Sequence, residues 1–353
     1  MTESSPEIPV RSLYFEKPGV VSIREYSVRG PKRGEVVVKT LFSAISAGTE
    51  SLIYKGQWPQ TLAVDETIPT LAGRFSYPLK YGYSAVGRII DVGKNVSPEW
   101  IGRLAFAFNP HETHFVTSPD KLILIPEGIT PKGACFLPNM ETALNLVMDG
   151  NPIFGETVAI FGQGVVGLLT TALLSRMSLE KIVTFDKYLM RRQASALMGA
   201  DLCVDPGAGF GMDQFEEFFA NSLTDDGRAD LTYELSGLPQ VLNQAISITG
   251  YGGRIVVGSF YGSKNASIEF GGWFHRSRIK LISSQVSSIA PELTGRWSKT
   301  RRLGFAIKMV SQIEPERLVT HEINFSNAGK AYELLIDKPQ ETIQVILSYE
   351  EGK

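Results

Sequence analysis

The chain has 353 residues, of which 43% are hydrophobic and 20% are charged, proportions typical of a globular protein rather than a disordered or fibrous one. Its 35 Lys and Arg residues nearly balance 37 Asp and Glu residues, so charge favours neither nucleic acid nor a membrane surface as partner, and a small molecule is expected. Single cores stop growing at roughly 250–300 residues, so this length predicts two domains.

The region from residue 10 to about residue 129 consists of short β-rich runs separated by Gly and Pro. These runs are VSIREYSV, EVVVKTLFSAIS, SAVGRIIDVG, RLAFAF, HFVTSP and KLILIP. Strands at this spacing, without helices between them, predict a small twisted, barrel-like domain. Apolar residues then take helical spacing, and PKGACFLPNMETALNLVMDG predicts a helix that ends at Gly150.

After residue 150, apolar strands alternate with helices. The runs are TVAIFG, VVGLLTTALLSRM, KIVTFD, RRQASALMG, LCVD, DQFEEFFANSL, LTYELSG, LPQVLNQAISIT and GRIVVGSF. Strict alternation predicts an α/β fold with a doubly wound parallel sheet of the Rossmann type. Two later helices, RRLGFAIKMVSQI and NAGKAYELLID, precede a last strand, TIQVILSY. We therefore predict domains at 1–150 and 151–290, with 291–353 completing the first.

The turn after TVAIF carries the strongest local motif. It is a GxGxxG sequence made of Gly162, Gln163, Gly164, Val165, Val166 and Gly167. In such a turn the first glycine permits a tight bend, the second lets the backbone approach a pyrophosphate, and the third lets the helix pack closely on the strand. The helix N-terminus then faces the phosphates. Between strand and helix, the motif predicts a dinucleotide site rather than a plain glycine-rich turn.

Asp186 closes the next strand, about 20 residues further on, where a carboxylate accepts hydrogen bonds from the ribose hydroxyls. A carboxylate repels a 2′-phosphate, so NAD is expected. Lys187, Arg191 and Arg192 follow at once; they either soften that repulsion or form a solvated helix face, so NADP stays open. The further predicted cofactor-binding residues are Ser236, at the end of LTYELSG, and Gly258 and Ser259, at the end of GRIVVGSF.

Several short motifs spread over nearly the whole chain point to one family. They are Gly48-Thr49-Glu50, YGYSAVGRIIDVG, Gly102-Arg103, LPNMETALN, the GxGxxG turn and Gly199-Ala200-Asp201. Together they resemble the medium-chain dehydrogenase/reductase superfamily, which includes alcohol, polyol and threonine dehydrogenases and zinc-free quinone reductases. The resemblance implies a β-rich GroES-like barrel domain beside the Rossmann domain. It also implies a homodimer in which the strand KLISSQVS pairs across the interface.

A narrower resemblance lies in the runs SAISAGTES, FAFNPHETHFV, NMETALN and SSQVSSI with GRWSKTRR. They are similar to the branch that includes the hydroxyethyl-bacteriochlorophyllide dehydrogenases. This implies interconversion of a secondary alcohol and its ketone.

The zinc ligands of the superfamily are missing. Zinc members have Cys-Gly-Thr-Asp and Gly-His-Glu runs, where this chain has Ala47-Gly48-Thr49-Glu50 and Gly82-Tyr83-Ser84. The cysteine lobe for structural zinc is also absent from FAFNPHETHFV. Catalytic zinc takes about three protein ligands, so no metal is predicted. His111 and His114 are too few to replace them, and we interpret them as ordinary surface or loop histidines, with substrate positioning as the alternative.

Without zinc, a hydrogen-bond donor must stabilise the developing alkoxide during hydride transfer. Thr49 matches the hydroxyl that passes the substrate proton on in relatives, and Tyr83 occupies the position of the lost histidine; either is a candidate donor. Glu50 is expected to orient one of them or to pair with a base such as Arg88. Glu141 is the remaining acidic candidate, in a helix that contributes a ligand in zinc relatives; the alternative is a helix residue satisfying a nearby donor.

Positive charge gathers late in the chain. The residues are His275, Arg276 and Arg278 in HRSRIK, and Arg296, Arg301 and Arg302 in GRWSKTRR. A carboxylate or phosphate on the substrate is one explanation, because Arg binds such groups bidentately. A solvated helix start or a subunit contact is the other, and we favour it.

The predicted function is therefore a zinc-independent, NAD(H)-dependent oxidoreductase that interconverts a secondary alcohol and its ketone. One alternative is a zinc-free quinone- or enoyl-type reductase using NADPH, against which Asp186 argues. Another is a dinucleotide-binding protein without turnover. Cys135 and Cys203 have no neighbouring Cys or His, and the start MTESSPEIPVRS lacks the pattern of a signal peptide. A cytoplasmic protein outside the membrane is expected.

Overall fold

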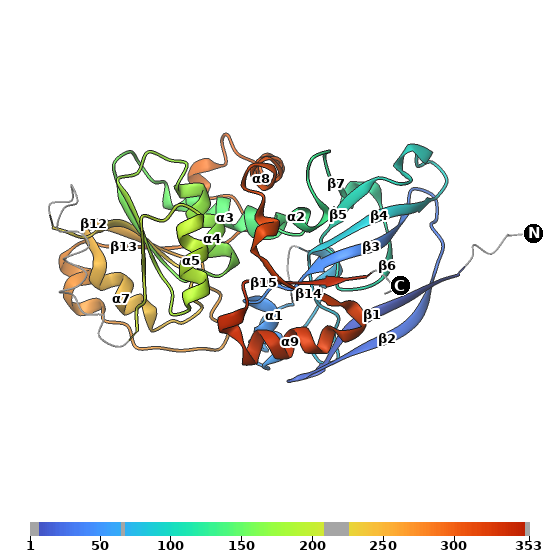
Figure 1. Cartoon of the computed structure of the whole chain (residues 1–353), viewed down its shortest axis with the longest axis horizontal. Coiled ribbons are helices and arrows are strands. Elements are labelled where there is room, and N and C mark those ends of the chain that lie inside the picture. The colour runs from blue at the N-terminus through green and yellow to red at the C-terminus, as the bar shows by residue number, and fades with distance from the viewer. Residues whose placement is uncertain (1–6, 65–67, 208–225, 350–353) are drawn as a thin grey trace, which may run out of the picture. The chain divides into compact units, whose positions relative to one another are not determined.

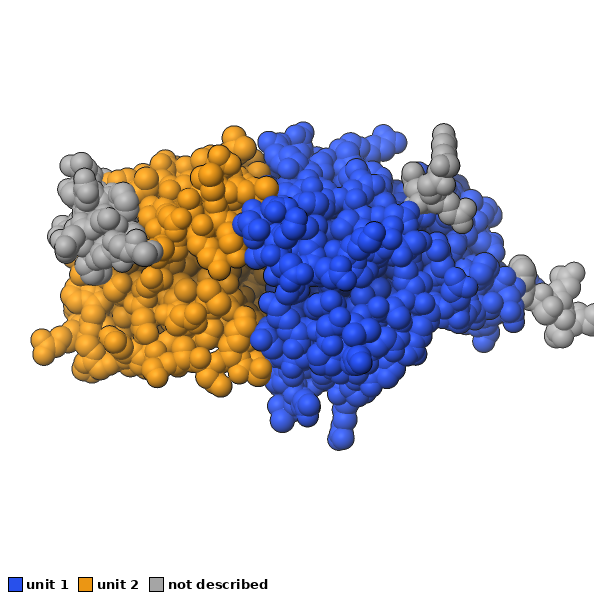
Figure 2. Space-filling view, turned by 60° about the horizontal axis from the view of Figure 1, so that its bottom comes forward, with its two compact units in different colours: residues 1–138, 310–353 blue, residues 139–309 orange. Residues whose placement is uncertain are grey.

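The computed structural model describes residues 7–64, 68–207 and 226–349. The chain forms two compact units, which Figure 2 colours separately: unit 1 comprises residues 1–138 and 310–353, and unit 2 comprises residues 139–309. The chain passes from one unit to the other inside helices α3 (Leu137–Gly150) and α8 (Lys299–Ile313). The domain boundaries expected at residues 150 and 290 stay a prediction. Within the described ranges, no helix is both long and apolar enough to cross a bilayer.

Unit 1 is built on a seven-stranded sheet of order β14-β15-β3-β4-β5-β7, in which β6 also pairs with β3. The strands are β3 (Val36–Ala44), β4 (Ala85–Val92), β5 (Leu104–Ala107), β6 (His114–Thr117), β7 (Ile123–Leu124), β14 (Val319–Asn324) and β15 (Gln344–Ser348). A separate antiparallel pair joins β1 (Glu7–Lys17) to β2 (Val20–Arg29). Strand β15 runs antiparallel to β3, so the C-terminal segment completes a sheet that begins near the N-terminus (Figure 1).

The helices of unit 1 are short. They are α1 (Thr49–Tyr54), α2 (Pro131–Ala134) and α9 (Ala328–Asp337). Buried side chains from β1, α1 and α9 form one core, including Phe15, Ile53 and Tyr332. The single helix expected from residue 131 to Gly150 is wrong, because the chain forms α2 and then α3. Pro138 explains the break: it lacks the N–H that a continuous helix needs, but is tolerated in the first turn of α3.

Unit 2 contains a six-stranded sheet of order β10-β9-β8-β11-β12-β13, and every pair in it is parallel. The strands are β8 (Thr157–Phe161), β9 (Lys181–Phe185), β10 (Leu202–Val204), β11 (Ala229–Glu234), β12 (Thr249–Val257) and β13 (Lys280–Ser283). The helices are α3, α4 (Val165–Leu174), α5 (Leu189–Leu197), α7 (Val241–Ile248) and α8 (Figure 1). This order confirms the doubly wound sheet. The helix expected over DQFEEFFANSL lies outside the described residues.

The strands of unit 2 follow directly from their composition. All five residues of β8 are buried, and β9 and β11 are nearly so, as expected for parallel strands covered on both faces. Because the strands are parallel, their carboxyl ends lie at one edge of the sheet. The residues that follow β8, β9, β11 and β12 there are Gly162, Asp186, Leu235 and Gly258. This edge carries the candidate cofactor residues of unit 2.

Candidate functional site

The glycine motif lies in the turn between β8 and α4, and two of its glycines are required by the fold. Gly162 has φ of +90°, and a Cβ there would lie 2.6 Å from the carbonyl carbon of Leu235. A Cβ at Gly167 would lie 2.0 Å from the carbonyl oxygen of Gly162. A larger residue at either position would therefore push α4 away from the sheet. The predicted close packing of helix and strand thus requires glycine at both positions.

Gly164 differs from both. It has φ of −70°, and a Cβ there would meet nothing within 4 Å. Its side-chain space stays open at the N-terminus of α4, a ten-residue helix that has no side-chain cap there. The first N–H groups of a helix lack partners within the helix and carry partial positive charge, so they bind phosphate well. This cradle, which a Cβ would partly fill, fits a dinucleotide pyrophosphate.

Asp186 lies beside this turn, with 7% of its surface exposed. Its Oδ2 accepts a hydrogen bond from the Gln163 N–H at 2.8 Å, and its Oδ1 accepts one from the Tyr188 N–H at 2.9 Å. Each carboxylate oxygen can accept a further bond, so Asp186 suits a ribose hydroxyl. Lys187 and Arg191 both lie over the Tyr188 ring, and Arg191 Nη1 is 3.9 Å from Asp186 Oδ2.

Ser236, Gly258 and Ser259 lie at the same edge, at the ends of β11 and β12, and hydrogen bonds connect this region. The Gly237 N–H donates to Ser259 Oγ at 2.9 Å, and the Gly258 N–H donates to the Glu234 carbonyl at 3.1 Å. The structure thus brings all the predicted cofactor residues to one edge of unit 2. Their contact with a cofactor stays a prediction.

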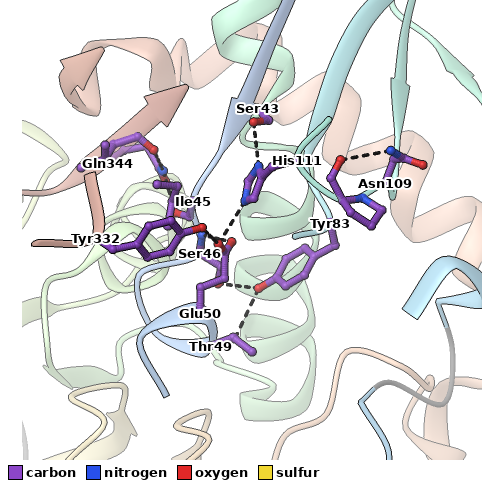
Figure 3. A network of polar contacts seen from close by, with 12 residues as sticks. Ser43, Ile45, Ser46, Thr49, Glu50, Tyr83, Asn109, His111, Tyr332 and Gln344 are labelled. Atoms are coloured by element: carbon purple, nitrogen blue, oxygen red, sulfur yellow. Dashed lines mark hydrogen bonds and ion pairs between the residues drawn. The ribbon is translucent and has the colours of Figure 1, made fainter. Parts of the chain in front are cut away.

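A row of three hydroxyl groups lies in unit 1 (Figure 3). Thr49 begins α1, and its Oγ1 is 3.4 Å from the hydroxyl of Tyr83, which lies just before β4. The Tyr83 hydroxyl donates to Ser46 Oγ at 2.5 Å. The two predicted hydroxyls therefore lie side by side. Ser46 is an addition for which the sequence offered no signal beyond its nearness to Thr49.

Glu50 lies beside these hydroxyl groups and is wholly buried. Its Oε1 accepts from the Ser46 N–H at 2.8 Å, and its Oε2 accepts from the Tyr332 hydroxyl at 2.6 Å. Burial and then the charge of Glu50 raise the pKa of Tyr332 well above its usual value, so the phenol keeps the proton that it donates. The expected pairing of Glu50 with Arg88 is wrong: Arg88 is exposed and donates to the Gly102 carbonyl.

His111 is the ionisable partner of Glu50. Its Nε2 lies 3.0 Å from Glu50 Oε2 and its Nδ1 lies 2.7 Å from Ser43 Oγ. Since a carboxylate accepts, Nε2 carries a hydrogen. His111 lies in the loop between β5 and β6, but the expected surface location is wrong, because it has no exposed surface and a Cβ at Gly82 would lie 2.7 Å from its ring. His114 lies on β6, with its Nδ1 3.3 Å from Thr113 Oγ1.

Glu141 belongs to unit 2, where Arg302 from α8 binds it. Arg302 is fully buried and donates to Glu141 Oε1 from Nε at 3.2 Å and from Nη2 at 3.0 Å. It also donates to Asn145 and to the carbonyls of Val286 and Ser288. Two predictions for Arg302 are therefore wrong: it does not lie at a solvated helix start, and its guanidinium is not free to bind a substrate anion. His275, Arg276, Arg278, Arg296 and Arg301, by contrast, are exposed.

Comparison with known proteins shows which enzymes the chain resembles. A family model described as zinc-binding dehydrogenase matches residues 165–302. D-guloside 3-dehydrogenase of Escherichia coli is 24% identical over 359 residues, covering 96% of this chain and 100% of that protein. L-threonine 3-dehydrogenase of Pyrococcus horikoshii is 25% identical, covering 90% and 93%. Over nearly its whole length the chain is therefore similar to dehydrogenases of the medium-chain dehydrogenase/reductase superfamily. The expected dehydrogenase-type enzyme is thereby confirmed.

Solved structures of dehydrogenases show the same fold as this chain. An E. coli alcohol dehydrogenase named rspB, complexed with NADH, has a TM-score of 0.75 at 21% identity and covers 97% of this chain and 99% of its own. The 2R,3R-butanediol dehydrogenase of Bacillus subtilis has a TM-score of 0.77 at 17% identity, with 97% and 100% covered. The predicted combination of a Rossmann unit with a GroES-like unit is confirmed.

The name of the matching family raises the question of zinc, and the residues present do not fit it. Across residues 7–64, 68–207 and 226–349, no group of three or more His, Cys, Asp or Glu side chains is placed to hold a metal. Glu50 and His111 are one acidic and one imidazole side chain in contact in unit 1. Their hydrogen bonds already use both carboxylate oxygens of Glu50 and both ring nitrogens of His111. Catalytic zinc needs about three free ligands.

Proposed function

We propose that this medium-chain dehydrogenase interconverts a secondary alcohol and its ketone with NAD(H) and without zinc. The observation that carries the proposal is the row of hydroxyls formed by Thr49, Tyr83 and Ser46, in which Tyr83 takes the place of a zinc ligand. Guloside, threonine and butanediol, named in the relatives, all carry a hydroxyl on a secondary carbon, which supports this substrate class. The homodimer, the cytoplasmic location and an anionic group on the substrate stay predictions.

The cofactor would be held by the edge of unit 2 described above. The Gly164 cradle and the α4 N-terminus would take the pyrophosphate, and Asp186 the ribose hydroxyls. When bound, the nicotinamide supplies the hydride chemistry, and the protein handles one proton.

The hydroxyls of unit 1 would handle that proton. During alcohol oxidation Thr49 accepts the proton from the substrate oxygen and passes its own to Tyr83, which in turn passes one to Ser46. Ser46 is partly exposed, so the proton can leave to water. In ketone reduction the proton moves along the same hydroxyls in the opposite direction, and Thr49 donates it to the developing alkoxide. Glu50 is a positioning residue here, because it holds the backbone of Ser46.

A turnover screen tests the proposal directly. The full chain is incubated with secondary alcohols, polyols and their ketones, with NAD(H) and NADP(H), and absorbance of the reduced cofactor is followed. We expect turnover with NAD(H) in a sample whose elemental analysis shows no stoichiometric zinc. One zinc ion per chain, lost together with activity on chelation, would contradict zinc independence. Tight cofactor binding without turnover of any alcohol or ketone would instead support a binding protein.

Cofactor choice is tested by Asp186→Ser. Loss of the charged acceptor is expected to weaken NAD binding by about 10–100-fold, since hydrogen bonds to charged groups contribute about 1.5–3 kcal/mol. NADP binding should strengthen, because the repulsion of its 2′-phosphate is removed. Isothermal titration with both cofactors measures the change, and Asp120→Ser, at an exposed carboxylate of unit 1, is the control. Equal weakening of both cofactors would mean that Asp186 only supports the turn.

A further inference from the structure

A second carboxylate at the cofactor edge has no role in the function proposed above. Glu234 ends β11 and has no exposed surface. Its Oε1 accepts from the N–H of Ser236 at 2.8 Å and from the hydroxyl of Ser236, and its Oε2 accepts from the hydroxyl of Tyr261 at 2.5 Å. No Lys, Arg or His among the described residues forms an ion pair with it.

The hydrogen bonds to Glu234 come from neutral groups. Three neutral donors point at its two oxygens, so these contacts bring no positive charge to the carboxylate. The pKa of Tyr261 is raised, first by burial and then by the negative charge of Glu234, so the phenol stays a donor. A buried charge without a counter-ion is unfavourable in a folded protein. The carboxylate is therefore suited to a cationic partner that residues 7–64, 68–207 and 226–349 do not supply.

The position of Glu234 in the sheet indicates that partner. A doubly wound sheet binds one mononucleotide over each half, and the crevice lies where the strand order reverses. One half of this sheet consists of β10, β9 and β8, and Asp186 follows the carboxyl end of β9. The other half consists of β11, β12 and β13, and Glu234 is the last residue of β11. Gly162 lies at the junction, since a Cβ there would lie 2.7 Å from the Cα of Ser236. If Asp186 holds the adenosine ribose, Glu234 belongs to the half that faces the nicotinamide nucleotide.

We propose that the Glu234 carboxylate makes unit 2 prefer oxidised NAD⁺ over NADH, because it attracts the positive charge of the oxidised nicotinamide ring. This inference rests on the proposed function, namely on NAD(H) binding at this edge. The two redox forms differ in that single charge. At an effective dielectric constant near 20, two opposite unit charges several ångströms apart attract by about 1–4 kcal/mol, and about 1.4 kcal/mol already changes the relative affinity tenfold.

The test compares dissociation constants for NAD⁺ and NADH, measured by isothermal titration on the full chain and on Glu234→Gln. Glutamine keeps the shape of the side chain and an acceptor for Ser236. The ratio Kd(NAD⁺)/Kd(NADH) is expected to rise by about tenfold in this variant. Glu234→Asp, which keeps the charge, and Glu269→Gln, which removes an exposed charge of the same unit, are expected to leave the ratio within about twofold of the wild type.

The outcomes separate this inference from the proposal on which it rests. A wild-type chain that binds neither cofactor would overturn the proposed function itself. Binding by the wild type with an unchanged ratio in Glu234→Gln, or with both affinities lowered equally, would show that Glu234 only shapes the loop. If Glu234→Gln does not fold, Glu234→Ala serves instead. It also removes the carboxylate charge, so the ratio should again rise by about tenfold, and an unchanged ratio would contradict the inference.

Discussion

Replacing Tyr83 by phenylalanine is expected to lower kcat by about 10²–10⁴-fold, the usual contribution of a positioned proton-transfer group. The phenol connects Thr49 Oγ1, at 3.4 Å, with Ser46 Oγ, at 2.5 Å, so its loss interrupts the row of hydroxyls while the ring keeps its packing. Affinity for NADH should stay within about twofold, because no predicted cofactor contact is removed. Stopped-flow turnover and fluorescence titration with NADH measure the two quantities separately.

The matched control for this variant is Tyr54→Phe. Tyr54 also belongs to unit 1, and its ring stacks on Tyr332 with centroids 5.5 Å apart, an arrangement that phenylalanine keeps. Its turnover should equal that of the wild type. If Tyr83→Phe turns over at the wild-type rate while Thr49→Ala does not, the proton passes from Thr49 without the phenol. If neither variant loses turnover, the hydroxyl row has no part in the chemistry.

Replacing Arg302 by methionine is expected to destabilise unit 2 by about 3–5 kcal/mol, because it leaves the buried carboxylate of Glu141 without its partner. The variant also loses the donors to the Val286 and Ser288 carbonyls. Urea unfolding followed by fluorescence would show the lower midpoint. Adding Glu141→Met should restore much of the loss, since a buried ion pair can often be replaced by apolar side chains of similar volume.

An exposed ion pair provides the comparison for Arg302. Arg317 donates to Glu314 at 2.8 Å, but the two side chains are 53% and 66% exposed. Arg317→Met should therefore change the free energy of unfolding by less than about 1 kcal/mol. Equal effects of the Arg302 and Arg317 substitutions would mean that the buried pair contributes no more than a solvated one.

The parts of the site that could be predicted are those whose geometry is local. The GxGxxG turn lies within six consecutive residues between a buried strand and a helix, so composition and order alone indicated its position. Asp186 followed from the same reasoning, because it closes the next parallel strand at the same edge. Thr49 and Tyr83 are 34 positions apart, and only the resemblance to a known superfamily suggested that they act together.

The partners of the buried charges could not be predicted in this way. Glu50 meets His111 across 61 positions and Tyr332 across 282, and Arg302 meets Glu141 across 161. Sequence motifs suggested Arg88 as a partner for Glu50 and an exposed position for a loop residue, His111; Arg88 contacts the Gly102 carbonyl instead, and His111 is buried. Glu234 ends a strand that is buried almost throughout, but that strand also contains Asp230 and Thr232, so the sequence pattern does not single it out.

The sequence by itself determined the alternation of strands and helices, the parallel sheet and the turn beside Asp186, because hydrophobic periodicity and glycine positions act over a few neighbouring residues. Only the tertiary structure decided which buried carboxylate received a histidine, an arginine or neutral donors. That choice depends on which distant segments meet in the core, where an unpaired charge is strongly unfavourable, and no local pattern encodes it.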